Sequence, residues 1–244
     1  MNRIEISKLN KAFIKDGKRL KVLEDISLSV GENEFVSVVG PSGCGKSTLL
    51  RSIAGLISYD EGNVHISGGT SYLQQKTMLM PWRNVYDNVN LPLELKSGKK
   101  EQGNPIVLKL LEEFGLEGFE NHMPGELSGG MAKRAALARS YLEDREILLL
   151  DEPFSSLDAI SRRAMQKWLL DVWESHRKSV VFVTHDIDEA LLLSDRIYVL
   201  SGRPATVSGE FAPGFGRPRD FDIAYTHEFM KKKKHIEKIL LENI

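Results

Sequence analysis

The sequence predicts an α/β fold that carries an α-helical insertion. Short apolar runs at 35–39, 147–150 and 180–183 are typical of strands buried on both faces, and helix-like patterns follow them. Between 76 and 145 the β-rich pattern gives way to helical periodicity. We therefore expect a parallel or mixed sheet flanked by helices and interrupted by one helical segment.

Composition limits the class of protein. The 244 residues are 41% hydrophobic and 27% charged, which suits one large α/β domain or a domain with a sizeable insertion. The net charge of -1 predicts no bulk attraction to nucleic acid or to anionic lipid. No apolar run approaches the ~20 residues of a membrane helix, and residues 1–5 lack the apolar core of a signal peptide. The single cysteine excludes an intramolecular disulfide and fits a reducing cytosol.

Two strands are expected before the first buried run, at 4–9 and 20–30, around a polar turn at 15–18. Phe13 stands just before this turn. Its side chain could belong to the core, or it could stack on a nucleotide base, because every base offers a π-face. The chemistry of the residue alone favours neither interpretation.

The run at 35–39 leads into a phosphate-binding motif. Residues 40–47 fit G-x-x-x-x-G-K-[ST] at every fixed position, after a strand and before a helix, which is the context that a P-loop requires. Its glycines allow backbone N–H groups to surround phosphate oxygens, while the lysine reaches the β- and γ-phosphates and the serine can ligate Mg²⁺. The candidate nucleotide-binding residues are Gly40, Pro41, Ser42, Gly43, Cys44, Gly45, Lys46, Ser47 and Thr48. We favour Cys44 as a small loop residue over an oxidation-sensitive thiol.

A helix is expected to continue over 49–54 and to end at Gly55. A short strand follows at 64–66, and a further strand ends over 71–75 with two amides, one of them Gln74. In the insertion, Gly115 ends a helix that follows a polar surface loop at 97–104. The apolar face of that helix consists of Ile106, Leu110, Leu111 and Phe114.

An apolar cluster, Met78–Trp82, is expected in a loop of the insertion. It could be local core or a docking surface. We favour the docking surface, because Met and Trp are common in adaptable interfaces.

Acidic residues end the buried run at 147–150. Asp151 stands where a P-loop enzyme holds Mg²⁺, and Glu152 is placed to orient or deprotonate an attacking water. His185 follows the run at 180–183 and can donate a hydrogen bond to the γ-phosphate. The sequence therefore predicts nucleotide hydrolysis at one edge of the sheet.

The C-terminal third continues the α/β pattern. An amphipathic helix is expected over 159–176, and Asp186 is expected to cap the next helix with Glu189 as its capping-box partner. A strand at 196–201, a Gly/Pro-rich segment and a helix over 226–243 complete the chain. The lysine run at 231–234 is interpreted as a solvated helix face, with a membrane-surface contact as the alternative.

A second phosphate-binding helix start lies at Ser128, Gly129 and Gly130. Serine can cap the following helix, and the Gly-Gly pair lets backbone amides approach an anion closely. Because one chain with one P-loop does not need two such sites, we expect two chains to pair head to tail, each completing the nucleotide site of the other.

Together these motifs resemble the ATPase subunit of ABC transporters. The resemblance covers nearly the whole chain, in the order and with the spacing of that family, and it includes Ser155–Asp158. It implies ATP and Mg²⁺ as cofactors. By position, the resemblance implies that Phe13 stacks on adenine and that Gln74 contacts Mg²⁺ and senses a transmembrane partner. It implies that Ser128, Gly129 and Gly130 bind the γ-phosphate of the opposite subunit and that Asp158 links the two sites. Glu152 would be the catalytic base and His185 the switch histidine.

The resemblance also implies a domain organisation. A RecA-like P-loop NTPase core with an N-terminal antiparallel β subdomain would comprise 1–75 and 146–225. A helical signature subdomain would span 76–145, and a C-terminal helix would span 226–244.

Segments at 79–85, 87–89, 186–190 and 217–220 are similar to importers of the nitrate/sulfonate/taurine type, a group that includes transporters for thiamine-precursor pyrimidines. The chain is thus expected to energise import of a small solute from the cytoplasmic face of the cell membrane. Its partners would be integral membrane permease subunits, a second copy of the ATPase and, indirectly, a substrate-binding protein, with no nucleic acid. The alternative is a soluble ABC ATPase without a permease; a P-loop kinase would leave 127–131 unexplained.

Overall fold

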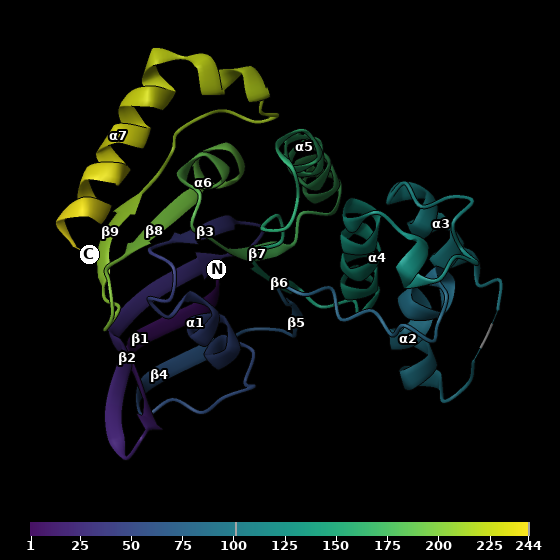
Figure 1. Ribbon diagram of the computed structural model, residues 1–244, viewed down its shortest axis with the longest axis horizontal. Coiled ribbons are helices and arrows are strands. Elements are labelled where there is room, and N and C mark those ends of the chain that lie inside the picture. The colour runs from purple at the N-terminus through teal and green to yellow at the C-terminus, as the bar shows by residue number, and fades with distance from the viewer. Residues whose placement is uncertain (101, 244) are drawn as a thin grey trace. The chain divides into compact units, whose positions relative to one another are not determined.

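A computed structural model describes residues 1–100 and 102–243. Glu101, in the surface loop expected at 97–104, and Ile244, the last residue of the expected C-terminal helical segment, lie outside the described residues. Contacts group the chain into two compact units (Figure 1). The first unit comprises Met1–Thr70, Glu146–Glu152 and Arg177–Ile244, and the second comprises Ser71–Arg145 and Pro153–His176. The domain bounds expected from the sequence stay predictions.

A parallel sheet forms the centre of the first unit. Strand β3 (Phe35–Val39) lies between β7 (Ser179–Thr184) and β8 (Arg196–Leu200), β6 (Ile147–Asp151) lies beyond β7, and all four are parallel. Every residue of β3, β6 and β7 is buried, which explains why these segments are mostly apolar rather than alternating between apolar and polar residues. Strand β9 (Val207–Phe211) adds to β8 in the antiparallel direction.

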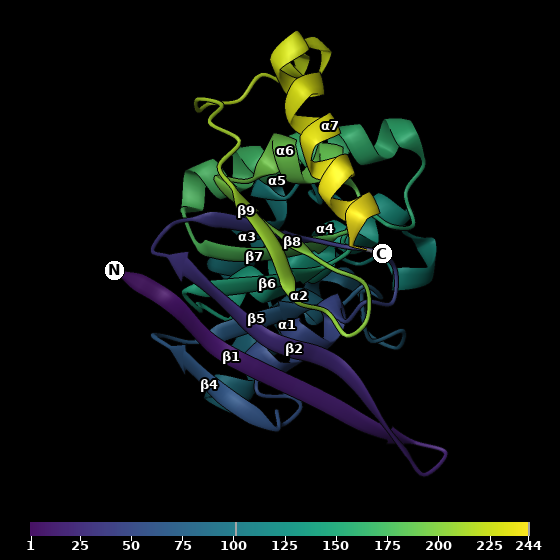
Figure 2. The same ribbon diagram turned by 90° about the vertical axis from the view of Figure 1, so that its left-hand side faces the viewer.

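An antiparallel sheet of order β2-β1-β4 belongs to the same unit (Figure 2). Strands β1 (Asn2–Lys15) and β2 (Lys18–Gly31) are longer than the predicted 4–9 and 20–30, because register shifts let them stay paired along their whole length. They join at Asp16 and Gly17, whose φ angles of 52° and 73° suit a two-residue hairpin turn. Strand β4 (Glu61–Ile66) pairs with the other edge of β1.

Three α-helices of the first unit begin and end at signals present in the sequence. Helix α1 (Lys46–Ile53) ends before Gly55, whose φ is 68°. Helix α7 (His227–Glu242) follows the short η2 (Phe221–Tyr225), and Thr226 caps it by accepting the N–H of Phe229. Helix α6 (Ile187–Leu193) has Asp186 as its predicted N-cap.

The capping box predicted for α6 is wrong in one detail. Asp186 accepts the N–H groups of Asp188 and Glu189, as expected for an N-cap. The Glu189 carboxylate instead accepts a hydrogen bond of 2.6 Å from the Thr184 hydroxyl, which in turn accepts the N–H of Asp186 at 3.0 Å. The Thr184 hydroxyl therefore bridges the Glu189 carboxylate and the N–H of Asp186, the two groups that the predicted capping box would join directly.

The second unit is helical after β5 (Thr70–Leu73) enters it. It contains α2 (Val85–Ser97), α3 (Pro105–Glu113), η1 (Pro124–Glu126), α4 (Gly129–Leu142) and α5 (Ala159–His176). Phe114 lies at its core, with T-shaped contacts to Tyr141 at 5.4 Å and to Trp168 at 5.2 Å between ring centroids.

The apolar face predicted for α3 is shifted by one residue. Ile106 is 62% exposed, whereas Val107, Leu110, Leu111 and Phe114 are buried. Spacing of i, i+3, i+4 and i+7 from Val107 gives the better helical stripe, because Ile106 lies in the first turn and faces away from it. Among the described helices of both units, none combines the length and apolar character needed to cross a membrane.

Candidate nucleotide-binding site

The parallel register of the first unit brings the predicted catalytic residues to one edge of the sheet. Val39 of β3 pairs with Thr184 of β7, and Asp151 of β6 pairs with Val183. The P-loop, Glu152 and His185 therefore leave the carboxyl ends of three adjacent strands together, which is where α/β folds bind ligands.

The P-loop connects β3 to α1 and packs closely against β2. Gly45 has a φ of 133°, and a Cβ atom there would lie 2.9 Å from side-chain carbons of both Leu23 and Val22. Only glycine satisfies this conformation and this spacing together. The loop consequently presents its backbone at the N-terminus of α1, where N–H groups and the helix dipole favour a bound phosphate.

Lys46 is folded onto the loop it belongs to. Its ammonium group donates to the carbonyl oxygens of Gly40 at 2.8 Å and Pro41 at 2.9 Å, and it lies 3.8 Å from a carboxylate oxygen of Glu152. Only 4% of the lysine side chain is exposed. A positive charge is thus held inside the loop, where it can attract nucleotide phosphates.

Ser47 and Asp151 bring together two oxygen atoms that could ligate a metal ion. The Ser47 hydroxyl donates to Asp151 Oδ1 at 2.9 Å, and Asp151 is 3% exposed. Across 1–100 and 102–243, no cluster of three or more His, Cys, Asp and Glu side chains could hold a metal ion by itself. One carboxylate with one hydroxyl suits Mg²⁺ that also takes oxygens from phosphates and water.

Glu152 and His185 are in direct contact. Glu152 Oε2 lies 3.2 Å from His185 Nδ1, and the N–H of Glu152 donates to the carbonyl oxygen of Val183 at 3.0 Å. The φ of Glu152 is 44°, a left-handed conformation that costs a non-glycine residue about 1–3 kcal/mol. The left-handed backbone and the contact with His185 thus occur at the same residue.

The structure adds Arg203, which sequence analysis missed. Its guanidinium donates to the carbonyl oxygen of Gly43, and Arg203 and Gly202 line a hollow of about 470 Å³ with residues 41–44. The turn that carries Arg203 is fixed to β2 by backbone hydrogen bonds between Ala205 and both Val22 and Glu24. No local pattern signals this contact, because it joins segments 160 residues apart.

Cys44 is buried at 2% exposure. Burial, the largest effect, raises the pKa of its thiol above the ordinary value, although the nearby Lys46 acts in the opposite direction. The reactive thiolate is therefore disfavoured. This supports the interpretation of Cys44 as a small loop residue.

Phe13 is 40% exposed, so its ring does not belong to the core. The ammonium of Lys11 lies 5.1 Å from the centre of the ring. Lys11 pairs in register with Leu23, the residue that packs on Gly45, so the strand carrying Phe13 runs past the P-loop. An exposed ring on this strand suits the predicted stacking on a base.

The remaining candidates, Gln74, Ser128, Gly129, Gly130 and Asp158, belong to the second unit. Ser128 caps α4 as predicted, by accepting the N–H of Met131 at 3.3 Å. A Cβ atom added at Gly130 would meet no described atom within 4 Å, so packing within this chain does not require glycine there. The open helix start leaves room for close approach by another molecule.

Gln74 and Asp158 are both exposed. Gln74 directly follows β5, and the neighbouring Gln75 donates to the Ser155 hydroxyl at 3.3 Å. Asp158 caps α5 by accepting the N–H groups of Ile160 and Ser161. Hydrogen bonding by Ser161 lowers the pKa of the Asp158 carboxyl.

The Met-Trp loop, residues 77–84, is rigidly built but exposes large apolar side chains. Asn88 accepts the N–H of Met80 at 2.7 Å and donates to three backbone carbonyls of the loop and the start of α2. Arg139 donates to the carbonyl oxygens of residues 77 and 78. Met78 is nevertheless 58% exposed and Trp82 73% exposed, so these two side chains are not local core.

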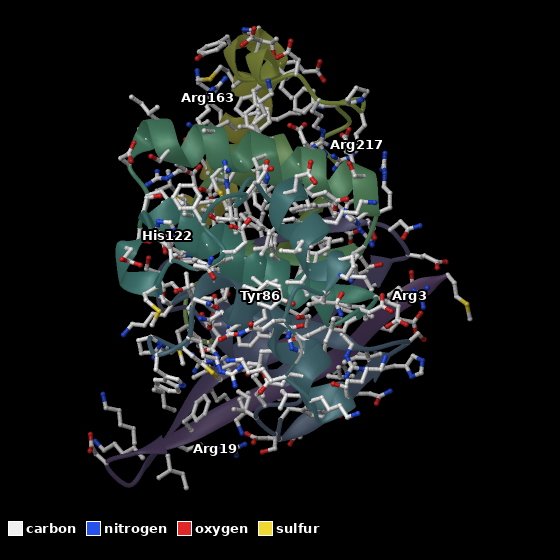
Figure 3. The ribbon with its side chains drawn as sticks, turned by 90° about the vertical axis from the view of Figure 1, so that its right-hand side faces the viewer. Arg3, Arg19, Tyr86, His122, Arg163 and Arg217 are labelled. Carbon is white, nitrogen blue, oxygen red and sulfur yellow. The ribbon has the colours of Figure 1, made fainter. Side chains whose placement is uncertain are left out.

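The start of α2 is anchored equally well. The N–H of Val85 donates to the carbonyl oxygen of His122, and the hydroxyl of Tyr86 accepts the N–H of Asn104 at 2.8 Å. Tyr86 and His122 are labelled in Figure 3, which shows the side of the molecule that carries them. The exposed apolar side chains thus lie on a fixed support.

Comparison with known proteins shows which family this chain is similar to. The family described as ABC transporter matches residues 23–155. An uncharacterized ABC transporter ATP-binding protein of Methanocaldococcus jannaschii is 44% identical over 99% of this chain and 92% of its own length. The formylaminopyrimidine import ATP-binding protein ThiZ of Halalkalibacterium halodurans is 39% identical over 91% of this chain and 90% of its own. The aliphatic sulfonates import ATP-binding protein SsuB of Bacillus subtilis is 42% identical over 84% of this chain and 82% of its own length.

Solved structures agree with this similarity. A dimeric ATP-binding cassette in a post-hydrolysis state, bound to ADP and Pi, superimposes with a TM-score of 0.76 and 31% identity, over 87% of this chain and all of the other. A dimeric bacterial ABC transporter cassette gives the same TM-score with 32% identity over the same shares.

Proposed function

Because this chain belongs to the ABC transporter family and is an ATP-binding ATPase, we propose that it energises the import of a small solute. The named relatives act in import of aliphatic sulfonates and of formylaminopyrimidine, and they match most of this chain at about 40% identity. The solute is therefore proposed to be of the sulfonate or thiamine-precursor type.

The contact between Glu152 and His185 carries the hydrolytic part of the proposal. Lys46 would exchange its two carbonyl acceptors for phosphate oxygens, and Ser47 and Asp151 would hold Mg²⁺. The ion, when bound, neutralises charge on the phosphates. Glu152 would accept the proton of an attacking water, and His185 would hold the carboxylate in position and donate toward the γ-phosphate. Gln74 is proposed as a further ligand of the ion.

A second copy of the chain is proposed to complete the site. Ser128 caps α4, and the space around Gly130 within this chain is open, so the start of α4 is available for a phosphate bound by another subunit. Asp158 would link the two sites. Support comes from the dimeric form of the similar cassettes.

The Met-Trp loop is proposed to bind an integral membrane permease at the cytoplasmic face of the membrane. Two large apolar side chains, Met78 and Trp82, are exposed on a backbone that hydrogen bonds hold in place. Adaptable apolar side chains on a rigid support suit a protein interface.

Co-purification from native membranes in mild detergent tests the proposal. The tagged wild-type chain should retain an integral membrane protein, and its ATP turnover should rise when a substrate-binding protein and solute are added to the reconstituted complex. The double change Met78→Ser with Trp82→Ala should abolish retention, while Leu241→Ser, at a side chain 75% exposed on α7, should not. A wild-type chain that retains no membrane protein would instead indicate a soluble ABC ATPase.

A further inference from the structure

A second pocket lies in the first unit, away from the P-loop. It has a volume of about 320 Å³ and is formed by α6, by β9 with the two residues after it, and by α7. Figures 1 and 2 show α7 alongside β9 and α6. We call it the α6–α7 pocket. None of its lining residues belongs to the nucleotide-binding candidates.

The floor of the α6–α7 pocket is apolar. Leu191 and Ile236 are each 1% exposed, and the ring of Phe211 packs edge-on against His235 at 5.1 Å between centroids. Burial of an aliphatic chain or a ring on such a floor is favourable, since about 25 cal/mol is gained for each Å² of apolar surface removed from water.

The rim of the pocket carries an excess of positive charge. Lys231, Lys232 and Glu228 line it from one face of α7. Glu228 is neutralised by Lys232, whose ammonium lies 2.8 Å from the carboxylate, donates to the carbonyl oxygen of Pro213 and lies 4.6 Å from the centre of the Phe215 ring. Lys231 is exposed and makes no ion pair with any residue the structure describes. One uncompensated positive charge remains.

The walls are fixed before any ligand arrives. Lys233 pairs with Asp188 at 2.8 Å and ties α7 to α6. Arg219 donates to the carbonyl oxygens of Leu191 and Leu192 at the C-terminal end of α6, which suits a cation there. A preformed pocket loses less binding free energy to ordering than a pocket that must form.

We propose that the α6–α7 pocket binds a small monovalent organic anion with an apolar body, of the alkyl or aryl sulfonate or carboxylate class. The single charge matches the one unpaired lysine, and the apolar body matches the floor. A volume of about 320 Å³ is at the lower end for ligand pockets and selects a short chain. The proposal stands independently of the importer function.

Calorimetric titration of the full chain with 1-hexanesulfonate tests the proposal. Saturating MgADP is present so that the phosphate site is filled. For a ligand of about ten non-hydrogen atoms we expect a dissociation constant of about 1 mM or tighter. Methanesulfonate lacks the apolar body and 1-hexanol lacks the charge, so each should bind at least about fivefold more weakly. The proposal is overturned if methanesulfonate or 1-hexanol binds as tightly as hexanesulfonate, or if hexanesulfonate does not bind.

A matched pair of variants locates the site. Lys231→Glu and Lys234→Glu change the net charge equally, but Lys234 is exposed and does not line the pocket. Lys231→Glu should weaken hexanesulfonate binding at least about fivefold, whereas Lys234→Glu should leave it within about twofold. An equal loss in both variants would indicate general electrostatic attraction and contradict the assignment.

Chain length distinguishes a free solute from a lipid-derived anion. Dodecanoate carries the same single charge on a chain too long for the pocket, so it should bind no tighter than hexanesulfonate. Amide chemical-shift changes on adding hexanesulfonate should centre on α7 and β9. Tighter dodecanoate binding with the same shift pattern, or shifts confined to the P-loop, would refute a small-solute pocket.

Discussion

The Glu152 carboxylate lies 3.2 Å from His185 Nδ1, across the ends of two adjacent parallel strands. The two residues are far apart in sequence, and the parallel pairing of β6 with β7 brings them to neighbouring strand ends. We propose that the pair acts as one unit, in which the imidazole orients the carboxylate that would activate water.

Replacing Glu152 with Gln should keep ATP binding and lower turnover by at least about two decades, because the amide is a far weaker proton acceptor. Steady-state phosphate release and nucleotide-binding fluorescence measure the two effects separately. The variant with saturating ATP should also elute as a dimer in size-exclusion chromatography. Near-normal turnover would remove Glu152 from the role of base, and a strictly monomeric elution would count against the shared site.

A double-mutant cycle should show that Glu152 and His185 are coupled. His185→Ala alone should lower the turnover number by about ten- to a hundredfold, because the carboxylate loses its orienting partner. Combined with Glu152→Gln, it should cost clearly less than the sum of the two single losses in activation free energy. Simple additivity in single-turnover assays would mean that the two side chains act separately.

Arg203→Ala should weaken ATP binding by about two- to fivefold and leave the maximal turnover number nearly unchanged. The guanidinium hydrogen bond to the Gly43 carbonyl stabilises the P-loop, and an exposed hydrogen bond of this kind contributes about 0.5–1 kcal/mol. Arg51→Ala is the control, since Arg51 is exposed in the last turn of α1. A large fall in turnover with unchanged affinity would contradict this positioning role.

Asn88→Ala should lower the free energy of unfolding by about 1–3 kcal/mol, because Asn88 is fully buried and its loss leaves backbone groups of the Met-Trp loop unpaired. Urea denaturation measures this change. Asn63→Ala, at an exposed position of β4, should have almost no effect. Faster hydrogen exchange over 77–84 should accompany the loss; unchanged protection there would mean that Asn88 does not hold the loop.

Cys44 should react slowly with iodoacetamide in the folded protein. Burial raises the pKa of its thiol, so the thiolate fraction at pH 8 is smaller than in the unfolded chain, and the rate should increase as the pH is raised. Mass spectrometry of the labelled chain follows the reaction, with urea-unfolded protein as the reference. Folded protein that labels as fast as unfolded protein at pH 8 would show that the thiol is activated.

The sequence determined the local elements and their chemistry. Apolar runs identified β3, β6 and β7, and the P-loop spacing identified the turn between β3 and α1, because each pattern of residue types is contained in one short segment. Capping residues predicted the starts of α4 and α6 for the same reason. The apolar face predicted for α3 was displaced by one residue, and the burial of Val107 in place of Ile106 corrected it.

Tertiary structure decided which side chains meet. The contact of Glu152 with His185 follows from the pairing of β6 with β7, the contact of Arg203 with Gly43 joins segments 160 residues apart, and the α6–α7 pocket requires three separate segments. Strand order and helix docking are set by the burial of apolar surface over the whole unit, so no local stretch of sequence contains them.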